Sequence, residues 1–259
     1  MSSPARWDPA VYELFKAERA RPFRDLLALL KRRPGLRVVD LGCGTGETTR
    51  ELHAELGAVR TLGLDSSPEM LDRARSLAGG GLSFELGSIE SFEPAERFDV
   101  VFSNAALHWV EDHRALFAGL RRLLADGGQL AVQMPAMDGH HPSHTVAAEV
   151  AQEEPFGLAP RVSPLLPLDD YASLLFELGA RDAGAQLVRM QIYAHPLPSR
   201  DDVVTWVSGS LLTDYQKRLT PELFEGFLER YRERLREQLP PDHPYLYCYR
   251  RVLLWGKFA

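Results

Sequence analysis

Three glycines stand at alternate positions directly after a short apolar run, in the segment Val38-Val39-Asp40-Leu41-Gly42-Cys43-Gly44-Thr45-Gly46. A glycine has no Cβ, so its backbone can take positive φ and a ligand can come close to the main chain. An apolar strand that leads into such a turn and then into a helix is typical of nucleotide-type ligand sites. The segment therefore predicts a ligand-binding turn at the carboxyl end of a first strand.

The charges around this turn separate two classes of ligand. A dinucleotide fingerprint needs a third glycine at the position of Glu47, where an acid at a helix start repels a pyrophosphate. Asp40, just before the turn, adds to this repulsion. A ligand that carries an ammonium and a sulfonium group is attracted by the same acids. Asp40 and Glu47 therefore favour S-adenosylmethionine over a dinucleotide.

Three later turns carry residues that fit an adenosine ligand. Asp65 and Ser66 follow a second apolar run, where a carboxylate can accept hydrogen bonds from two ribose hydroxyls. Ser88 and Ile89 follow a third run and are expected to flank the adenine ring, and Asn104 follows a fourth. Open parallel sheets bind ligands beyond the carboxyl ends of their strands, so we expect these residues to surround one site.

Short apolar runs alternate with helical patterns between about residues 36 and 135, which predicts βαβ units and a parallel sheet. The expected strands of this block span about 37–41, 60–64, 83–86, 98–103 and 128–134. Two later strands are expected at about 186–194 and 246–257. All seven are expected to belong to one sheet.

Several local signals predict where helices begin and end. Ser67 and Pro68 are a favourable N-cap and first residue. The buried face of that helix is expected to hold Met70, Leu71, Ala74 and Leu77. Asp126-Gly127-Gly128 is expected to end another helix before the fifth strand. Near the N-terminus, two helical segments are expected to meet at Arg21-Pro22.

We expect one domain over residues 1–259. Its expected parts are an N-terminal helical cap (1–35), a ligand-binding core (36–135), helical insertions (138–182 and 199–243) and the last strands (186–194 and 246–257). The insertions are expected to form a cover over the active site.

Composition narrows the class of protein. The chain has 259 residues and 45% hydrophobic content, enough for a large core. A net charge of -6 argues against nucleic acid and anionic membranes as partners, because both repel an acidic surface. Only two cysteines and no signal-peptide pattern indicate a reducing, cytoplasmic location. We expect a small-molecule partner and a monomer or homodimer.

The segments D-L-G-C-G-T-G, L-D-S-S-P-x-M-L and F-D-V-V-F-S-N resemble those of class I S-adenosylmethionine-dependent methyltransferases, over about residues 36–135. The resemblance implies a Rossmann-like α/β fold with a seven-stranded, mostly parallel sheet, its sixth and seventh strands reversed in order and the last antiparallel. It also implies S-adenosyl-L-methionine as methyl donor and S-adenosyl-L-homocysteine as product. The implied contacts are Gly42, Gly44 and Gly46 with the methionine part, Asp65 with the ribose, Ser88 and Ile89 with adenine, and Asn104 near the sulfonium. Many relatives have aspartate at the position of Ser88, so here a hydroxyl or main-chain contact is expected.

Over nearly the whole chain, the sequence is similar to the trans-aconitate 2-methyltransferase family. The similar segments are 7–9, 17–22, 130–135, 142–144, 202–207 and 249–251. This resemblance implies methyl transfer to a small carboxylic acid, giving its methyl ester. Arg19, Arg21 and Arg250 are then candidates for binding carboxylates, because a guanidinium can donate two parallel hydrogen bonds to one. Trp109 is expected to line the acceptor site.

Two departures from that family leave the acceptor open. Thr213, beside Asp214, replaces an expected arginine, and His108 replaces a glutamine before Trp109. A carboxylate acceptor needs no general base, whereas an alcohol, phenol or ammonium must lose a proton, for which His108 has a suitable intrinsic pKa. The alternatives are therefore N-, C- or hydroxyl O-methylation of another small metabolite with His108 as base, or a cofactor-binding protein without turnover.

Other chemically capable residues are expected to be structural. His140, His141 and His144 lie close in sequence, but no thiol or carboxylate stands at ligand spacing, which favours a solvated loop over a metal site. Cys43 is expected to pack under the ligand without chemistry of its own. The aromatic residues expected mainly in the core are Trp206, Tyr245 and Tyr247.

Overall fold

The computed structural model describes residues 16–159, 163–241 and 243–259, which form two compact units. The sheet unit comprises residues 21–135, 164–191 and 251–259. The helical unit comprises residues 16–20, 136–163 and 192–250 as far as they are described. Neither unit is a continuous stretch, so the chain passes back and forth between them. No helix in the described part of the chain is long and apolar enough to cross a membrane.

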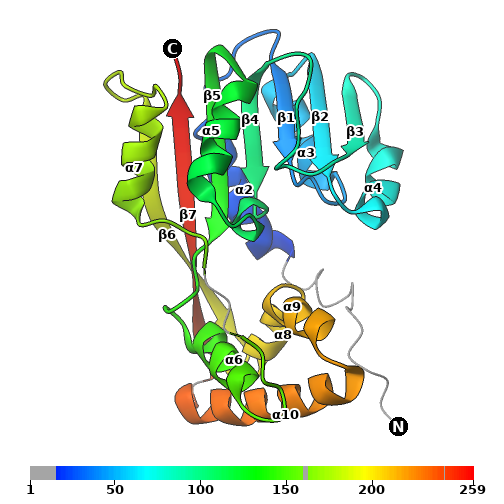
Figure 1. Ribbon diagram of the computed structural model, residues 1–259, viewed down its shortest axis with the longest axis vertical. Helices are drawn as coiled ribbons and strands as arrows, with labels where there is room; N and C mark the ends of the chain where they lie inside the picture. The colour runs from blue at the N-terminus through cyan, green and yellow to red at the C-terminus, as the bar shows by residue number, and fades with distance from the viewer. Residues whose placement is uncertain (1–15, 160–162, 242) are drawn as a thin grey trace. The chain divides into compact units, whose positions relative to one another are not determined.

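Seven strands form one sheet in the order β3-β2-β1-β4-β5-β7-β6 (Figure 1). They are β1 (Arg37–Leu41), β2 (Arg60–Asp65), β3 (Leu82–Leu86), β4 (Phe98–Asn104), β5 (Leu124–Pro135), β6 (Gln186–Leu197) and β7 (Tyr245–Lys257). The pairs from β3 to β5 are parallel, and β7 is antiparallel to β5. The expected α/β fold and its exchanged last strands are confirmed.

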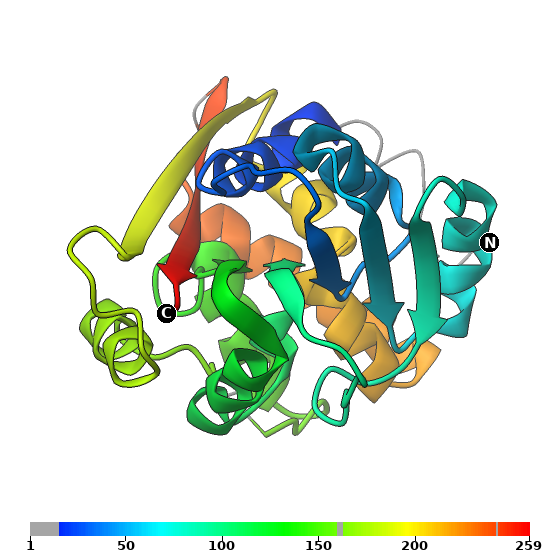
Figure 2. The ribbon, with the colours of Figure 1, turned by 90° about the horizontal axis from the view of Figure 1, so that it is seen from above.

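The helices of the sheet unit lie on both faces of the sheet. They are α2 (Lys16–Leu27, which begins in the helical unit), α3 (Glu47–Leu56), α4 (Pro68–Ala74), α5 (His113–Leu123) and α7 (Leu168–Glu177), with short 3-10 helices η1 (Arg75–Leu77) and η2 (Leu107–Trp109). Figure 2 shows α2 and α3 on one face and α5 on the other. Phe23 of α2 meets Phe102 of β4 edge to face at 5.7 Å, in a core that also contains Leu52 and Val100. Burial of this apolar surface holds the strand ends in place.

Helix α4 begins as predicted, because Ser67 Oγ accepts a hydrogen bond from Met70 N at 3.3 Å. Leu71 and Ala74 are buried against Cys43, but Met70 is 38% exposed. The prediction that Met70 belongs to the buried face of this helix is therefore wrong. The small cluster beneath this short helix covers only Leu71 and Ala74.

Two predicted element boundaries are wrong. Helix α2 runs through Pro22 without a break at Arg21-Pro22. Proline removes one backbone hydrogen bond, and burial of Phe23 and Leu26 on the sheet offsets that loss. Asp126-Gly127-Gly128 lies inside β5 and does not end a helix, because α5 already stops at Leu123. The register between β4 and β5 shifts there, which marks a bulge that the glycines accommodate.

The helical unit contains α6 (Pro142–Gln152), α8 (Asp202–Ser208), α9 (Leu211–Arg218) and α10 (Pro221–Gln238) around its own core. Trp206, Tyr245 and Tyr247 are buried there, as expected. Residues 164–182 of the first predicted insertion belong instead to the sheet unit, where Tyr171 of α7 packs on Phe117 of α5 at 5.5 Å. That the helical insertions cover the active site stays a prediction.

Candidate active site

The glycine turn joins β1 to α3 and is fixed by the neighbouring strand. The backbone N–H groups of Gly42 and Cys43 both donate to the carbonyl of Leu64, at 2.8 and 3.0 Å. Gly42, Gly44 and Gly46 have φ of 79°, 56° and 77°. These left-handed conformations are costly for any residue with a Cβ, which explains the three glycines.

The three glycines differ in what surrounds them. A Cβ on Gly42 would lie 2.1 Å from the Cβ of Ala106, and one on Gly46 would lie 2.7 Å from the ring of Phe84. A Cβ on Gly44 would meet no atom within 4 Å. Gly42 and Gly46 are therefore required by packing inside the protein. Gly44 is the glycine of this turn whose Cβ side is open to a ligand.

Asp65, at the end of β2, is held by the turn itself. Its Oδ2 accepts from the N–H of Gly44 at 2.8 Å, and its Oδ1 accepts from the N–H of Ser67 at 2.9 Å. A carboxylate oxygen has more than one acceptor direction, so both oxygens can still accept from hydroxyl groups. Ser66 beside it is exposed. The carboxylate is thus pre-oriented at the carboxyl end of the sheet.

Asp40 is buried beneath the turn and is only 2% exposed. Thr49 Oγ1 of α3 donates to it at 2.7 Å. Burial, with a smaller effect of the Asp65 charge, raises the pKa of Asp40 to about 7 despite the stabilising Thr49 bond. Asp40 therefore lies out of solvent beneath the turn and carries only part of its charge at neutral pH. Glu47 is the exposed acid at the start of α3.

Cys43 packs under the turn with Leu71 and Ala74. Burial, and then the charges of Asp40 and Asp65, raise the pKa of its thiol far above the usual range. A protonated thiol is a poor nucleophile, so the environment agrees with a packing role for Cys43.

An extended connection from β3 to β4 carries Ser88 and Ile89. Ser88 Oγ accepts from the N–H of Glu90 at 3.3 Å, which forms a local turn. The Cδ1 of Ile89 lies 3.8 Å from the place of a Cβ on Gly42, so this connection meets the glycine turn. Both residues are half-buried at the carboxyl end of the strands.

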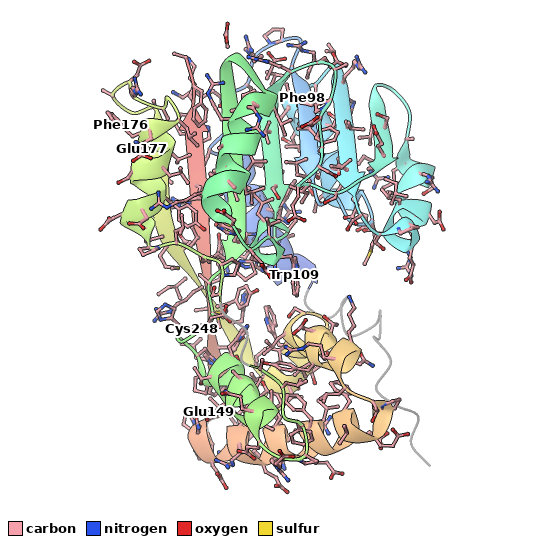
Figure 3. The ribbon with its side chains drawn as sticks, viewed as in Figure 1. Phe98, Trp109, Glu149, Phe176, Glu177 and Cys248 are labelled. Carbon is pink, nitrogen blue, oxygen red and sulfur yellow. The ribbon has the colours of Figure 1, made fainter. Side chains whose placement is uncertain are left out.

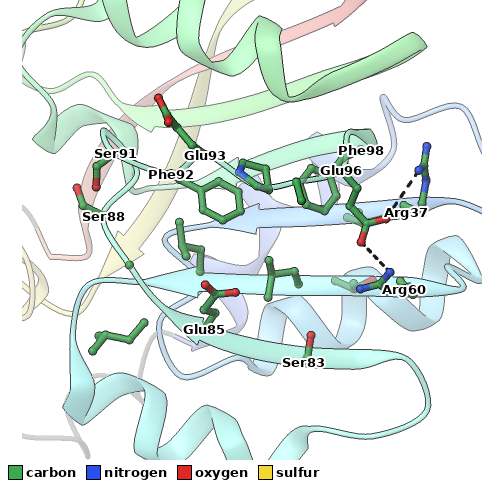
Figure 4. A pocket seen from close by; sticks show the side chains of 18 residues that line it. Arg37, Arg60, Ser83, Glu85, Ser88, Ser91, Phe92, Glu93, Glu96 and Phe98 are labelled. Carbon is green, nitrogen blue, oxygen red and sulfur yellow. Dashed lines mark ion pairs between the residues drawn. The ribbon is translucent and has the colours of Figure 1, made fainter.

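Glu96 fastens the other end of the same connection to the sheet. It forms ion pairs with Arg60 at 2.7 Å and Arg37 at 3.9 Å, drawn as dashed lines in Figure 4. Phe92 and Phe98 stack at 6.3 Å beside them. Between this connection and β1 to β3 lies a cavity of about 640 Å³ (Figure 4). Ser88 lines this cavity, but neither Gly44 nor Asp65 is among its lining residues.

His108 and Trp109 lie on η2, which follows β4. Their rings are 4.8 Å apart, and Trp109 is 51% exposed, near the carboxyl ends of the strands in Figure 3. The neighbouring segment is held by His113, whose Nε2 lies 3.1 Å from the carbonyl of Leu107 and whose Nδ1 contacts the hydroxyl of Tyr171. Burial lowers the pKa of His113, so a neutral ring bridges η2, α5 and α7.

Sequence reasoning missed two buried polar residues beside Asn104. Gln133 of β5 is 1% exposed and Arg251 of β7 is 8% exposed. Gln133 bonds to both Asn104 and Arg251, which joins three strands at the carboxyl end of β4 and β5. The sequence feature that could have identified them is a polar residue within an expected strand, at a position where buried residues are normally apolar.

The predicted acceptor residues are not brought together within one unit. Arg21 is exposed on α2 in the sheet unit, and the side chain of Arg19 lies outside the described atoms. Arg250 is half-buried on β7 in the helical unit. Its charge contributes, after burial, to lowering the pKa of nearby His141 to about 4.

His141 is not part of a solvated loop. It is 9% exposed and caps α6, where its Nδ1 accepts from the N–H of Ser143 at 3.0 Å. Its Nε2 lies 3.2 Å from the hydroxyl of Tyr245. In the described part of the chain, no group of three or more histidine, cysteine or acidic residues is arranged to hold a metal.

The predicted cofactor residues do converge. Those of the sheet unit are Asp40, Gly42, Gly44, Gly46, Asp65, Ser66, Ser88, Ile89 and Asn104, all in or directly after β1 to β4. The open side of Gly44, next to the oriented carboxylate of Asp65, is a cradle that a Cβ would fill. This arrangement fits a ribose-bearing ligand whose methionine part lies along the turn.

Comparison with known proteins supports this interpretation. Residues 38–128 match the family described as "Methyltransferase domain". Trans-aconitate 2-methyltransferase of Deinococcus radiodurans is 40% identical, over 95% of this chain and 96% of that protein. The enzyme of the same name from Klebsiella pneumoniae is 39% identical, over 96% and 94%.

Solved structures share the fold at low sequence identity. The YcgJ protein of Bacillus subtilis has a TM-score of 0.59 at 18% identity, covering 92% of this chain and 97% of its own. A phosphoethanolamine N-methyltransferase of Haemonchus contortus, solved with phosphomonomethylethanolamine and S-adenosylhomocysteine, has a TM-score of 0.53 at 15% identity, covering 92% and 52%. With the glycine turn, Asp65 and the sheet order, these similarities lead to one conclusion. The chain belongs to the class I S-adenosylmethionine-dependent methyltransferases.

Proposed function

We propose that this methyltransferase esterifies a carboxylate of a small polycarboxylic acid of the trans-aconitate type. The observation that carries the proposal is 40% identity to a trans-aconitate 2-methyltransferase over 95% of the chain. Carboxylic acids are ionised at neutral pH, so their oxygen can attack without a general base. The protein then has to position the reactants and exclude water.

The residues at the strand ends would hold the donor. Asp65 and Ser66 would bind the ribose hydroxyls, and Ser88 and Ile89 would flank adenine. Gly42, Gly44, Gly46 and Asp40 would surround the methionine part, with Asn104 on the sulfonium side. When bound, the cofactor supplies an electrophilic methyl group. The fixed carboxylate of Asp65 limits the freedom of the ligand, which favours an in-line approach of the acceptor.

Arg19, Arg21, Trp109 and Arg250 are the proposed acceptor residues. Arg250 forms no ion pair with any residue that the structure describes, so its guanidinium can pair with a ligand carboxylate. Asp214 does not add an isolated negative charge near Thr213, because it pairs with Arg218 at 3.3 Å. The replacement of arginine by Thr213 is therefore compatible with an anionic acceptor.

A methyl-transfer screen over organic acids, phenols and amines tests the proposal. We expect a methyl ester from trans-aconitate or a close analogue, and calorimetric binding of both S-adenosylmethionine and S-adenosylhomocysteine. Methylation of amines or phenols alone would contradict the acid as acceptor. Binding of the cofactor without transfer to any compound would favour a non-catalytic role.

His108 supports a second candidate, the methylation of an acceptor that must first lose a proton. The residue is half-buried on η2, directly after β4 and beside the exposed Trp109. For a carboxylate acceptor we expect His108→Gln to keep turnover within about threefold and to leave its pH profile unchanged. A loss of two or more orders of magnitude, with a lost inflection near neutral pH, would establish His108 as a base.

A further inference from the structure

Three polar side chains form a row across the carboxyl end of the sheet. The register pairs Asn104 of β4 with Gln133 of β5. Arg251 of β7 lies opposite Pro135, two positions from Gln133, so their side chains share one face of the sheet. Arg251 Nη1 donates to Gln133 Oε1 at 2.8 Å, and Gln133 Nε2 donates to Asn104 Oδ1 at 2.6 Å.

The chemistry of this row fixes the orientation of both amides. An arginine side chain can only donate hydrogen bonds, so Gln133 must turn its oxygen toward Arg251. The nitrogen of Gln133 then faces Asn104, which must accept with its own oxygen. The Asn104 amide nitrogen is the group left at the end of the row. It makes no hydrogen bond to another residue within the described part of the chain.

We infer that Asn104 donates an N–H to a carboxylate oxygen of the acceptor, and that Gln133 and Arg251 are positioning residues for this bond. The inference rests on the proposed function and goes further, because it assigns an acceptor-binding group and the device that orients it. Gln133 is 1% exposed and Arg251 is 8% exposed, so neither needs to touch the acceptor.

The positive charge of Arg251 determines which kind of ligand group the Asn104 N–H prefers as a hydrogen-bond partner. A donor group with an arginine behind it creates a positive potential, which favours an anion as its hydrogen-bond partner. The low dielectric around the buried glutamine lets each bond polarise the next one. A carboxylate acceptor placed beside the reacting methyl group matches this potential, whereas an amine acceptor does not.

The first test is Asn104→Asp, which keeps the shape and replaces the donor by an acceptor. We expect the dissociation constant of trans-aconitate for the complex with S-adenosylhomocysteine, measured by calorimetry, to rise about tenfold or more. The KM for the acid should rise with it. The affinity for S-adenosylhomocysteine should fall by a smaller factor than the affinity for the acid.

The second test separates orientation from charge. Gln133→Glu keeps a partner for Arg251, yet its carboxylate cannot donate to Asn104, whose amide then turns its nitrogen toward position 133. We expect a weakening of acceptor binding similar to that of Asn104→Asp. In an Asn104→Ala background the same substitution should add less than twofold, since there is no amide left to orient. A full additional loss there would mean that Gln133→Glu acts by charge alone, which overturns the orienting role.

Gln129→Glu is the matched control. Gln129 is also buried on β5, but it bonds to Lys31 and Trp255, outside the row. Its substitution should leave acceptor binding within twofold. An equal loss in this variant would mean that the effect of Gln133→Glu is general destabilisation, and the inference would fall.

The remaining outcomes separate the inference from the proposed function. If the wild-type enzyme neither binds nor methylates trans-aconitate or other di- and tricarboxylic acids, the proposed function fails and the inference fails with it. If it methylates the acid and Asn104→Asp leaves acceptor affinity unchanged, only the inference fails. Weaker binding of S-adenosylhomocysteine alone would assign Asn104 to the cofactor carboxylate and would also overturn it.

Discussion

Gly42, Gly44 and Gly46 share a left-handed backbone conformation, yet their surroundings make them unequal. A Cβ on Gly42 would overlap Ala106 and one on Gly46 would overlap Phe84, so both glycines allow close packing around the turn. Gly44 has open space on its Cβ side and donates its N–H to Asp65. Open space and close packing thus occur at different residues of one short segment.

We predict that Gly42→Ala and Gly44→Ala fail in different ways. Gly44→Ala should lower the free energy of unfolding by about 1–2 kcal/mol, the cost of a Cβ in the left-handed region, and should weaken S-adenosylhomocysteine binding at least about tenfold. Gly42→Ala should cost more than about 3 kcal/mol, since overpacking against Ala106 adds to the same strain. Urea denaturation and calorimetry measure the two effects.

Gly35→Ala provides the control for backbone strain. Gly35 has φ of 76° and no atom within 4 Å of a Cβ, and it lies before β1, away from the glycine turn. Its substitution should reproduce the stability loss of Gly44→Ala while leaving ligand affinity unchanged. Equal ligand affinity in Gly44→Ala and wild type would contradict the assigned role of Gly44.

Among the elements, η2, α5 and α7 are joined by one buried hydrogen-bond network. His113 of α5 reaches the Leu107 carbonyl of η2 and the Tyr171 hydroxyl of α7. The same hydroxyl accepts from the N–H of Leu166 at 3.3 Å. The position of His108 and Trp109 therefore depends on a helix that lies some sixty residues later in the sequence.

Tyr171→Phe removes this hydroxyl without changing the ring. We expect a loss of about 1–3 kcal/mol in the free energy of unfolding, because a buried ring nitrogen and a backbone N–H lose their partner. The exposed Phe176 of the same helix is the control, and Phe176→Leu should cost less than about 0.5 kcal/mol. Similar losses in both variants would show that the network is not what stabilises this packing.

Element types were predictable from the sequence, because all seven strands carry short apolar runs. The failures came from tertiary packing. Pro22 stays inside helix α2 because the residues next to it are buried. Gly127 lies in a bulge because α5 ends at Leu123 and β5 begins directly after it, at Leu124. In the candidate site, the position of Asp65 at the end of a strand could be predicted from the sequence. Those of Gln133 and Arg251 could not, since only the register of three strands brings these residues to Asn104.

For the whole molecule, each unit has a core and a buried histidine of its own. His113 lies in the sheet unit and His141 in the helical unit. Both rings have a lowered pKa, that of His141 at about 4. Both rings are neutral in the folded chain. Acidification is therefore expected to destabilise each unit through its own histidine.

We predict that acidification destabilises the helical unit through His141. Its pKa falls from 6.5 to about 4 on folding, so its contribution is fully present above about pH 6.5 and is lost as the pH falls toward 4. The loss should be at most about 3 kcal/mol. The difference between the urea midpoints at pH 7.5 and pH 5.0 should be smaller in His141→Asn than in the wild type. Asparagine can still cap α6 in this variant.

A neighbouring histidine provides the control for this prediction, and Asp40 has a pH effect of the opposite sign. His140→Asn changes an exposed neighbour and should keep the wild-type pH dependence. Asp40, with its raised pKa, gains stability on acidification, which is the opposite sign, so the comparison must be made between variants at each pH. Unchanged pH dependence in His141→Asn would contradict the assignment.

The strand order has a consequence for how the chain assembles as it is synthesised. β7 is made after every other strand, yet it lies between β5 and β6 in the sheet. Until β7 leaves the ribosome, β5 has an unpaired edge and β6 has no partner in the sheet, and Gln133 lacks the arginine that orients it. An unpaired edge is prone to pairing with other chains, so nascent protein is most exposed to aggregation just before this last strand inserts. The hydrogen-bonded row of Asn104, Gln133 and Arg251 can therefore form only after β7 has been made, whereas the glycine turn and Asp65 belong to segments that are made earlier.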